Sequence, residues 1–146
     1  MTASLGSRRT PLGLVIGAFL CTAWAALTAM VVPLAAAGAL PLSVGGAPVP
    51  ADRWMRVTGP LVVAAGLVMA IFAAGVAARR AWTRPLAPLL GAGIALYGAA
   101  GGLFGTVPPV VAGRSAVGGL ALTVLSVWYF YFTRGVDLYY RSLRRD

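Results

Sequence analysis

Few side chains in this sequence are of the types that carry chemistry. The acidic residues are Asp52, Asp137 and Asp146, the single cysteine is Cys21, and His, Glu, Lys, Asn and Gln do not occur. General acid–base catalysis rests mostly on His, Glu, Asp or Lys. Metal sites need clusters of His, Cys or carboxylate groups. The sequence therefore predicts no catalytic residue, no metal site and no cofactor, and we expect the protein not to be an enzyme.

The few reactive groups have simpler interpretations. Asp52 and Asp137 each lie near an arginine in the sequence, as expected for ion pairs or helix caps at a membrane surface. Cys21 lies inside an apolar run and cannot form an intrachain disulfide. We expect it to serve as a small packing residue.

Basic charge dominates the sequence. Twelve basic residues, all of them Arg, give a formal net charge of +9. They lie at the ends of apolar runs and form no aromatic-interleaved patch of the kind that binds nucleic acid. Anionic lipid headgroups are the predicted partner, at roughly 1 kcal/mol per Arg near the surface. The arginines expected to meet headgroups are Arg79, Arg80, Arg84, Arg134, Arg141, Arg144 and Arg145.

The composition is that of a membrane protein. Hydrophobic residues make up 60% of the chain and charged residues 10%, with a mean hydropathy of +0.86. A soluble domain has about 25% charged residues. The Ala-, Gly- and Arg-rich usage is typical of a high-GC bacterial genome, so the predicted location is a bacterial inner membrane.

Four apolar runs are each long enough to cross a bilayer, which takes about 20 residues in a helix. The predicted fold is an all-α integral membrane protein, a single domain whose four transmembrane helices form an antiparallel bundle. The spans are residues 11–37, 60–78, 85–105 and 115–133, followed by a basic tail of residues 134–146.

Hydroxyl residues precede the predicted spans, and three of them stand one or two residues before a proline. Thr10, Thr58 and Thr83 hold this position, and Ser115 opens the last span. Such hydroxyls are favoured helix caps, and proline is tolerated in the first turn. We expect all four to cap their helices.

Residues 1–40 have a second interpretation, as a cleaved signal peptide, because Arg8 and Arg9 precede the apolar run. The apolar region of a signal peptide is normally about 7–15 residues long. The run of residues 11–37 is nearly twice that length. This favours a retained first span.

Orientation follows from the distribution of the arginines. Nine of them fall in the N-terminal segment, the loop after the second span and the C-terminal tail, whereas three, Arg53, Arg56 and Arg114, fall in the other two loops. Arginine is enriched in cytoplasmic loops. Both termini are therefore predicted to be cytoplasmic.

Small residues recur at i, i+4 spacing in every span. Such rows let helix backbones approach closely in lipid, where little hydrophobic force drives helices together. We expect helix contacts along these rows. The glycines assigned to them are Gly13, Gly17, Gly66, Gly91, Gly93, Gly101, Gly105 and Gly119.

Aromatic residues gather where the spans should meet the membrane surface. Trp and Tyr are enriched at both interfaces of a bilayer. The loop of residues 38–59 is expected to be irregular in its Pro- and Gly-rich half and then to form a short turn. A docking platform for a partner is the alternative interpretation of the aromatic cluster in the last span. The predicted anchors are Trp54, Trp82, Trp128, Tyr129 and Tyr131.

No charged residue lies inside the four predicted spans, and intramembrane charges are the usual mark of ion pathways. We therefore expect a non-catalytic accessory, assembly or scaffold subunit that packs against other membrane subunits or self-associates. The alternative is a minimal oligomeric channel or carrier. A channel would place the embedded hydroxyls on one continuous polar path. Those hydroxyls belong to Thr22, Thr28, Tyr97, Thr123 and Ser126.

Overall fold

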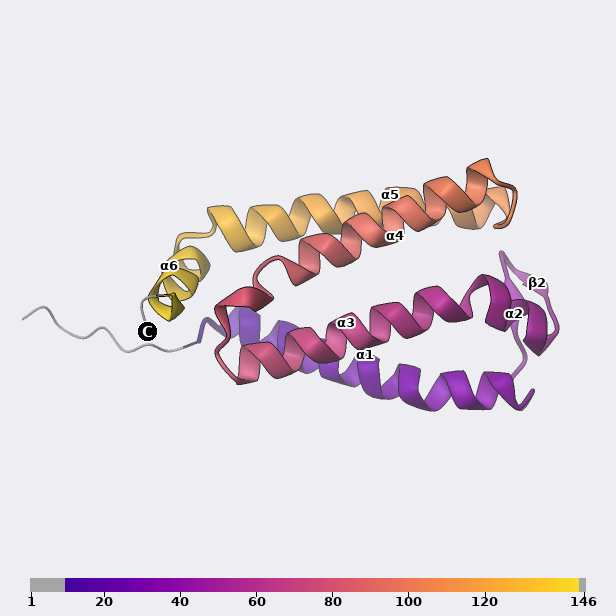
Figure 1. Cartoon of the computed structure of the whole chain (residues 1–146), viewed down its shortest axis with the longest axis horizontal. Helices are drawn as coiled ribbons and strands as arrows, with labels where there is room; N and C mark the ends of the chain where they lie inside the picture. The colour runs from indigo at the N-terminus through magenta and orange to yellow at the C-terminus, as the bar shows by residue number, and fades with distance from the viewer. Residues whose placement is uncertain (1–9, 145–146) are drawn as a thin grey trace, which may run out of the picture.

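Uninterrupted apolar sequence forms long helices in the computed structural model, which describes residues 10–144. The chain is mostly helical, and within the described residues four helices are long and apolar enough to cross a membrane. The predicted all-α class with four apolar helices is confirmed. The long helices are α1 (Leu12–Ala36), α3 (Gly59–Ala77), α4 (Leu86–Leu103) and α5 (Pro109–Val127) (Figure 1).

Shorter elements connect and extend these helices. The strands β1 and β2 and the helix α2 lie between α1 and α3, and a 3₁₀ turn η1 precedes α4. A π-helical turn η2 extends α5, and α6 follows it. Their bounds are β1 (Ser43–Val44), β2 (Ala47–Pro48), α2 (Ala51–Val57), η1 (Ala81–Thr83), η2 (Trp128–Phe132) and α6 (Arg134–Leu143).

The fourth span differs from its predicted bounds at its start. Helix α5 begins at Pro109 rather than at Ser115, so Arg114 lies within its second turn. Proline is favoured in the first turn of a helix because its missing N–H would have no partner there. A long arginine side chain near a helix end can reach the interface with its charged group. The sequence predicts a last span without charged residues, whereas α5 contains one, Arg114.

The expected hydroxyl caps are also wrong. Helices α1, α3, α4 and α5 have no side-chain capping hydrogen bond, and the cap positions of α1, α4 and α5 are held by prolines. The Thr83 hydroxyl instead donates to the carbonyl oxygen of Arg80 at 2.8 Å. A proline at the cap position has no side-chain oxygen, so it cannot accept a hydrogen bond from the first N–H groups of the helix.

Two helix ends use a left-handed residue. Helix α4 is followed by Gly105 at φ 66°, and the amide of Thr106 donates to the carbonyl of Gly101. Helix α3 is followed by Arg79 at φ 53°, a conformation that costs an L-residue roughly 1–2 kcal/mol. Gly105 thus lies in a helix-ending turn and not along a helix face, because only glycine adopts this conformation at no cost.

The long helices pack as two pairs. Helix α1 packs along α3 and α4 packs along α5, whereas α3 and α4 approach each other at fewer positions, and the two pairs are stacked in Figure 1. Buried side chains cluster at both ends of the molecule. One cluster includes Leu14, Phe72, Phe130 and Tyr140, and the other is formed by Ala35, Val44 and Trp54. The middle of the α3–α4 contact is left open.

The segment between α1 and α3 is more regular than expected. Strands β1 and β2 pair antiparallel through a two-residue turn, Gly45–Gly46, in which both residues have positive φ. This is the turn type that matches the twist of a hairpin. Helix α2 follows, and Trp54 on it is buried against Ala35 and Val44. The expected short turn at this place is therefore a helix that a tryptophan holds against the end of α1.

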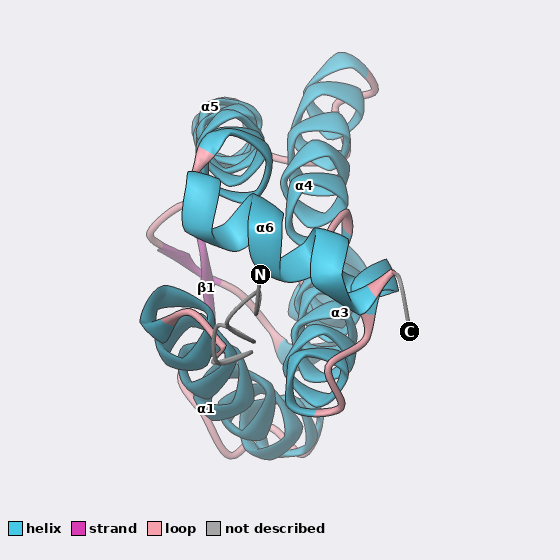
Figure 2. Ribbon diagram, turned by 90° about the vertical axis from the view of Figure 1, so that its left-hand side faces the viewer, coloured by secondary structure: helices cyan, strands magenta, loops and turns pink. Residues whose placement is uncertain are grey.

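The last helix lies across the other end of the molecule (Figure 2). Helix α6 buries Val136, Tyr139 and Tyr140 and exposes Leu138 and Arg141. Its residues are therefore divided between an apolar face and a polar face. The buried face packs on η2 and η1.

Candidate functional site

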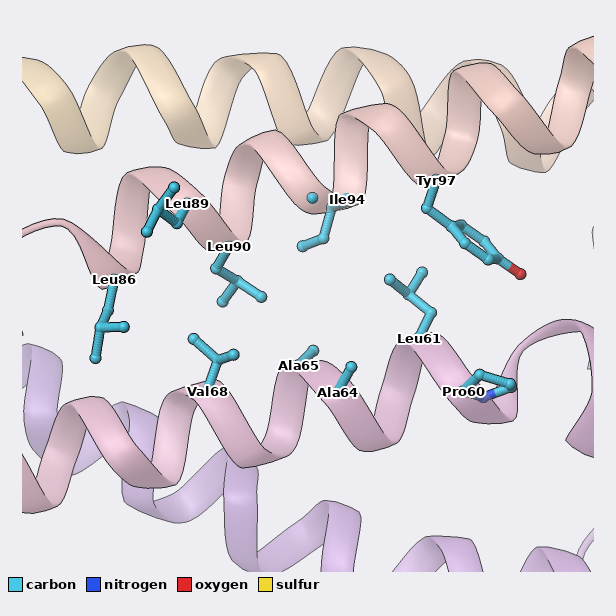
Figure 3. A pocket seen from close by; sticks show the side chains of 11 residues that line it. Pro60, Leu61, Ala64, Ala65, Val68, Leu86, Leu89, Leu90, Ile94 and Tyr97 are labelled. Atoms are coloured by element: carbon cyan, nitrogen blue, oxygen red, sulfur yellow. The ribbon is translucent and has the colours of Figure 1, made fainter.

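A groove opens between the two helix pairs, on the facing sides of α3 and α4 (Figure 3). Its volume is about 470 Å³, within the range of small-molecule sites in proteins. We call it the central groove. Its lining residues are Pro60, Leu61, Ala64, Ala65 and Val68 of α3, and Leu86, Leu89, Leu90, Gly93, Ile94 and Tyr97 of α4.

The groove is apolar because branched side chains face each other across it. Leu90 and Val68 point toward one another from the two helices, as Figure 3 shows. Side chains of this size on both helices keep the backbones apart. The one hydroxyl of the lining belongs to Tyr97, and it donates a hydrogen bond to the carbonyl oxygen of Val57. That carbonyl lies in the last turn of α2, where carbonyls lack a partner within the helix.

A small chamber adjoins the central groove toward the interior. Its volume is about 100 Å³, and it shares Val68, Leu86 and Leu90 with the groove. Cys21 and Phe72 complete its inner wall. Cys21 is half-buried there, in the packing position that the sequence predicts.

A second, shallower depression lies between α1 and α3. Its volume is about 350 Å³, and we call it the outer trough. The two helices are close here: a Cβ atom on Gly66 would lie 2.8 Å from Cγ2 of Thr28. The lining residues, most of them small, are Ala25, Thr28, Ala29, Val32, Pro33, Val63, Gly66, Leu67 and Ala70.

A buried arginine joins the two helix pairs at the end of the molecule where α6 lies. Nε and Nη2 of Arg84 donate to the carbonyl oxygen of Phe130 at 3.1 and 2.7 Å, and Nη2 also donates to Oδ1 of Asp137 at 2.7 Å. Its guanidinium carbon lies 4.1 Å from the centre of the Tyr131 ring. We call this group of residues, together with Thr83 and Tyr140, the arginine corner.

The corner forms where α5 runs out of hydrogen-bond partners. The last carbonyl oxygens of a helix accept no hydrogen bond from an N–H group of the same helix. The C-terminus of a helix also carries a partial negative charge. Arg84 supplies both the missing donors and a positive charge to the carbonyl of Phe130. Phe130 lies within the π-helical turn η2, which extends α5. Arg84 therefore acts as a C-terminal cap for α5 that comes from the loop before α4.

Asp137 supplies the negative charge of the arginine corner. It lies in the first turn of α6, where a negative charge is favourable. Its other oxygen, Oδ2, pairs with Nε of Arg141 at 2.7 Å. The hydrogen bond from Arg84, opposed by partial burial and reinforced by the charge of Arg141, holds the pKa of Asp137 below its ordinary value.

A hydroxyl pair ties η1 to α6 beside the ion pair. The oxygens of Thr83 and Tyr140 lie 3.1 Å apart. Burial raises the pKa of Tyr140 above its ordinary value, so its hydroxyl stays neutral. The ring of Tyr140 packs against Phe130 and Tyr139. The corner is thus a fully bonded polar group inside an aromatic cluster.

The predicted packing glycines fall into two groups. A Cβ on Gly91 would lie 2.7 Å from the backbone nitrogen of Thr123, and one on Gly119 would lie 2.6 Å from the carbonyl oxygen of Gly91. Gly13, Gly66 and Gly101 face the side chains of Tyr129, Thr28 and Val107. A Cβ would meet no atom within 4 Å at the other three positions, Gly17, Gly93 and Gly105.

The predicted anchors and headgroup arginines are mostly exposed. Trp82, Trp128 and Tyr131 are exposed and Tyr129 is half-buried, whereas Trp54 is buried. Trp54 differs from an interfacial anchor because the hairpin covers it. The exposed arginines are Arg79, Arg80, Arg134, Arg141 and Arg144, and Arg145, Arg8 and Arg9 lie outside the described residues.

Arg84 was expected to face lipid headgroups, and its placement corrects that expectation. Only 6% of the residue is exposed, because its guanidinium is hydrogen-bonded to the carbonyl oxygen of Phe130 and to the carboxylate of Asp137. The sequence neighbours of Asp137 point to Arg134 and Arg141 as its partners. A contact between residues 53 positions apart leaves no signal in the local pattern.

Gly98 is a contact residue that the i, i+4 rows omit. A Cβ there would lie 2.6 Å from the backbone nitrogen of Ala116. Gly91 and Gly98 are seven residues apart, so they share a helix face. A search at i, i+7 spacing would have found the pair.

The described residues contain no group of three or more His, Cys, Asp or Glu that could hold a metal ion. Comparison of the chain with protein-family models, with curated proteins and with solved structures finds no match. The side chains at the described sites make apolar contacts, ion pairs and hydrogen bonds.

Proposed function

We propose that the protein is a non-catalytic accessory, assembly or scaffold subunit of a bacterial inner membrane that packs against the helices of another membrane protein. The observation that carries this proposal is the outer trough. Its small residues lie on a surface of α1 and α3 that no other part of the described chain covers. Ala29 and Ala70 are both exposed there.

The trough suits a helix because small residues allow two backbones to come close. In lipid, helices associate through dispersion and packing, since the acyl chains are as apolar as the side chains. Gly66 already allows such an approach between α1 and α3. A partner helix lying over Ala25, Ala29 and Ala70 would extend the same mode of contact to a third helix.

The proposed topology is an antiparallel four-helix arrangement with both termini in the cytoplasm. The nine-to-three distribution of arginines supports it. The test uses reporter fusions: those after Thr83 and Asp146 should report the cytoplasm, and one after Pro48 should report the periplasm. A periplasmic C-terminus would overturn this topology.

A minimal channel is the alternative, and it needs the embedded hydroxyls on one path. The hydroxyls of Thr22 and Thr123 donate to the carbonyls of Ala18 and Gly119 in their own helices. The Tyr97 hydroxyl donates to Val57. These three hydroxyls already have partners, and the other two embedded hydroxyl residues, Thr28 and Ser126, are buried. This arrangement supports the packing subunit over a continuous polar path.

The experiment compares two tryptophan substitutions on α1. Ala29→Trp fills the outer trough, and Ala23→Trp places the same side chain at an exposed position outside it. Each tagged variant is purified in native nanodiscs, and membrane proteins present in stoichiometric amount are quantified. The proposal predicts a membrane protein that is lost with Ala29→Trp and kept with Ala23→Trp, with unchanged melting of both variants in detergent.

Two results would overturn the proposal. One is the absence of a stoichiometric partner that responds to Ala29→Trp. The other is selective ion or solute flux from the purified protein alone in liposomes, which would favour the channel.

A further inference from the structure

In the proposed topology the end of α3 that follows α2 lies at a membrane surface, and the central groove runs inward from it. Pro60 lies in the first turn of α3, directly after α2, and Val68 lies eight residues further along. Eight residues of helix cover roughly 12 Å, close to the depth of one leaflet in a hydrocarbon core about 30 Å thick. On α4 the lining runs from Leu86, the first residue of the helix, to Tyr97, or roughly 17 Å. The length of the groove is therefore comparable to the depth of one leaflet.

The groove is too small for a helix. A helix segment matching the stretch from Leu86 to Tyr97 would displace roughly 1,300 Å³ at a diameter of about 10 Å. The central groove holds about 470 Å³. A narrow, apolar, flexible occupant fits this space, and a transmembrane segment of a partner does not.

Positive charge stands at the surface end of the groove. Helix α2 carries Arg53 and Arg56, both exposed, and it ends three residues before Pro60. Arg56 pairs with Asp52 at 2.6 Å, and among the described residues no carboxylate lies within ion-pair distance of Arg53. A phosphate group at this level would meet an arginine that the described chain leaves without a counter-charge.

Two contacts fix the position of α2 beside the end of the groove where Tyr97 lies. Trp54 is buried against Ala35 and Val44, and the carbonyl of Val57 accepts the hydrogen bond from Tyr97. Helix α2, which carries both arginines, is therefore joined to the α4 wall of the groove through Tyr97.

We propose that the central groove binds one acyl chain of an anionic phospholipid from the leaflet that contains α2, with the lipid phosphate beside Arg53 and Arg56. The chain runs from Pro60 and Tyr97 toward Val68 and Leu86. Its end can enter the inner chamber, which shares Val68, Leu86 and Leu90 with the groove. This site goes beyond the proposed partner contact, since it lies on the opposite side of α3 from the outer trough.

Gly93 allows the groove to be filled without disturbing the helices. It lines the groove, and a Cβ there would meet no atom within 4 Å. Gly118 on α5 is equally open and lines neither the central groove, nor the inner chamber, nor the outer trough. Gly93→Leu and Gly118→Leu are therefore a matched pair in size, helix propensity and membrane exposure.

The test measures lipid binding to delipidated protein by native mass spectrometry, with palmitoyl-oleoyl-phosphatidylglycerol and palmitoyl-oleoyl-phosphatidylcholine as probes. The wild type should bind one phosphatidylglycerol tightly, and Gly93→Leu should weaken this binding by roughly tenfold, as for the loss of one or two buried methylene groups. Gly118→Leu should bind as the wild type does. Detergent melting confirms that both variants are folded.

The headgroup is tested separately from the chain. The double variant Arg53→Gln/Arg56→Gln should weaken phosphatidylglycerol binding by roughly thirtyfold, at about 1 kcal/mol for each of the two Arg, and leave phosphatidylcholine binding unchanged. Arg114→Gln, an exposed arginine on α5, is the control.

Equal binding by Gly93→Leu and the wild type would overturn the groove as the site. Equal binding of the two lipids by the wild type would overturn the anionic headgroup. Ala29→Trp should leave lipid binding intact, and Gly93→Leu should leave partner copurification intact. The failure of either proposal is thus distinguishable from the failure of the other.

Discussion

Helix α4 has two neighbours, and its contacts with them differ. On the side of α4 that faces α5 lie Gly91 and Gly98, and Gly119 of α5 lies on the facing side. Backbone atoms of the two helices are therefore in direct contact. Against α3 it presents Leu86 and Leu90, with Val68 opposite, and about 470 Å³ stays open between the two helices. The same helix is therefore closely packed on one side and separated on the other.

The difference lies in which residues face each other. A single small residue on one helix does not bring two axes together if the partner presents a branched side chain at the same level. Gly93 illustrates this: it lies on the α3 side of α4, and a Cβ there would still have open space around it. Glycine on both helices at one level brings the backbones into contact.

The largest expected effect comes from blocking the close contact. A Cβ on Gly119 would lie 2.6 Å from the carbonyl oxygen of Gly91. A backbone atom in a helix cannot move away from this contact as a side chain can by changing its rotamer. Gly119→Leu should therefore destabilise the protein by more than about 3 kcal/mol, above the usual range for an overpacked core. Gly118→Leu, one residue away in open space, should have little effect. Thermal melting in detergent measures both, and equal melting temperatures would show that α4 and α5 are not in contact.

The next effect concerns the arginine corner, which joins the two pairs. Asp137→Asn leaves Arg84 buried without its counter-charge, whereas Arg84→Gln leaves Asp137 with Arg141 as its remaining partner. Removing one partner of a buried pair is more harmful than replacing both. Each single variant should lower the melting temperature, and the double variant Arg84→Leu/Asp137→Leu should recover part of the loss. Arg56→Gln breaks an exposed pair and should cost at most about 1 kcal/mol. A double variant worse than both singles would contradict the pairing.

Acid should weaken the same corner. The pKa of Asp137 in the folded protein lies below its ordinary value of 3.8. Its contribution to stability is therefore fully present above that value and is lost as the pH falls through the lower folded pKa. Melting of the wild type should decrease as the pH drops below about 4. In Asp137→Asn this part of the decrease should be missing, and an unchanged acid profile in that variant would count against the assignment.

The smallest effect is expected at the mouth of the central groove. Tyr97→Phe removes the hydrogen bond to the carbonyl of Val57 and should cost about 1 kcal/mol. The melting temperature of this variant should lie close to that of the wild type. A cost similar to that of Gly119→Leu would mean that the α3–α4 contact depends on this bond far more than its open groove indicates.

The sequence predicts the helices well because their signal is local. A charge-free run of about 20 apolar residues has few alternatives to a spanning helix, and the glycine rows identify Gly91 and Gly119. The central groove could not be predicted, because it depends on which faces of α3 and α4 meet. The role of Arg84 could not be predicted either, since the unpartnered carbonyl of Phe130 exists only once α5 has ended beside it.

The two contacts of α4 can be compared directly by electron–electron double resonance in lipid nanodiscs. In a Cys21→Ser background, spin labels at Leu67 and Leu96 report the α3–α4 separation, and labels at Leu96 and Leu120 report the α4–α5 separation; all three positions are exposed. We predict narrow distance distributions for both pairs that match the separations in this structure, with the groove between α3 and α4 kept open. A shorter α3–α4 distance, with the two helices as close as α4 and α5, would contradict the account.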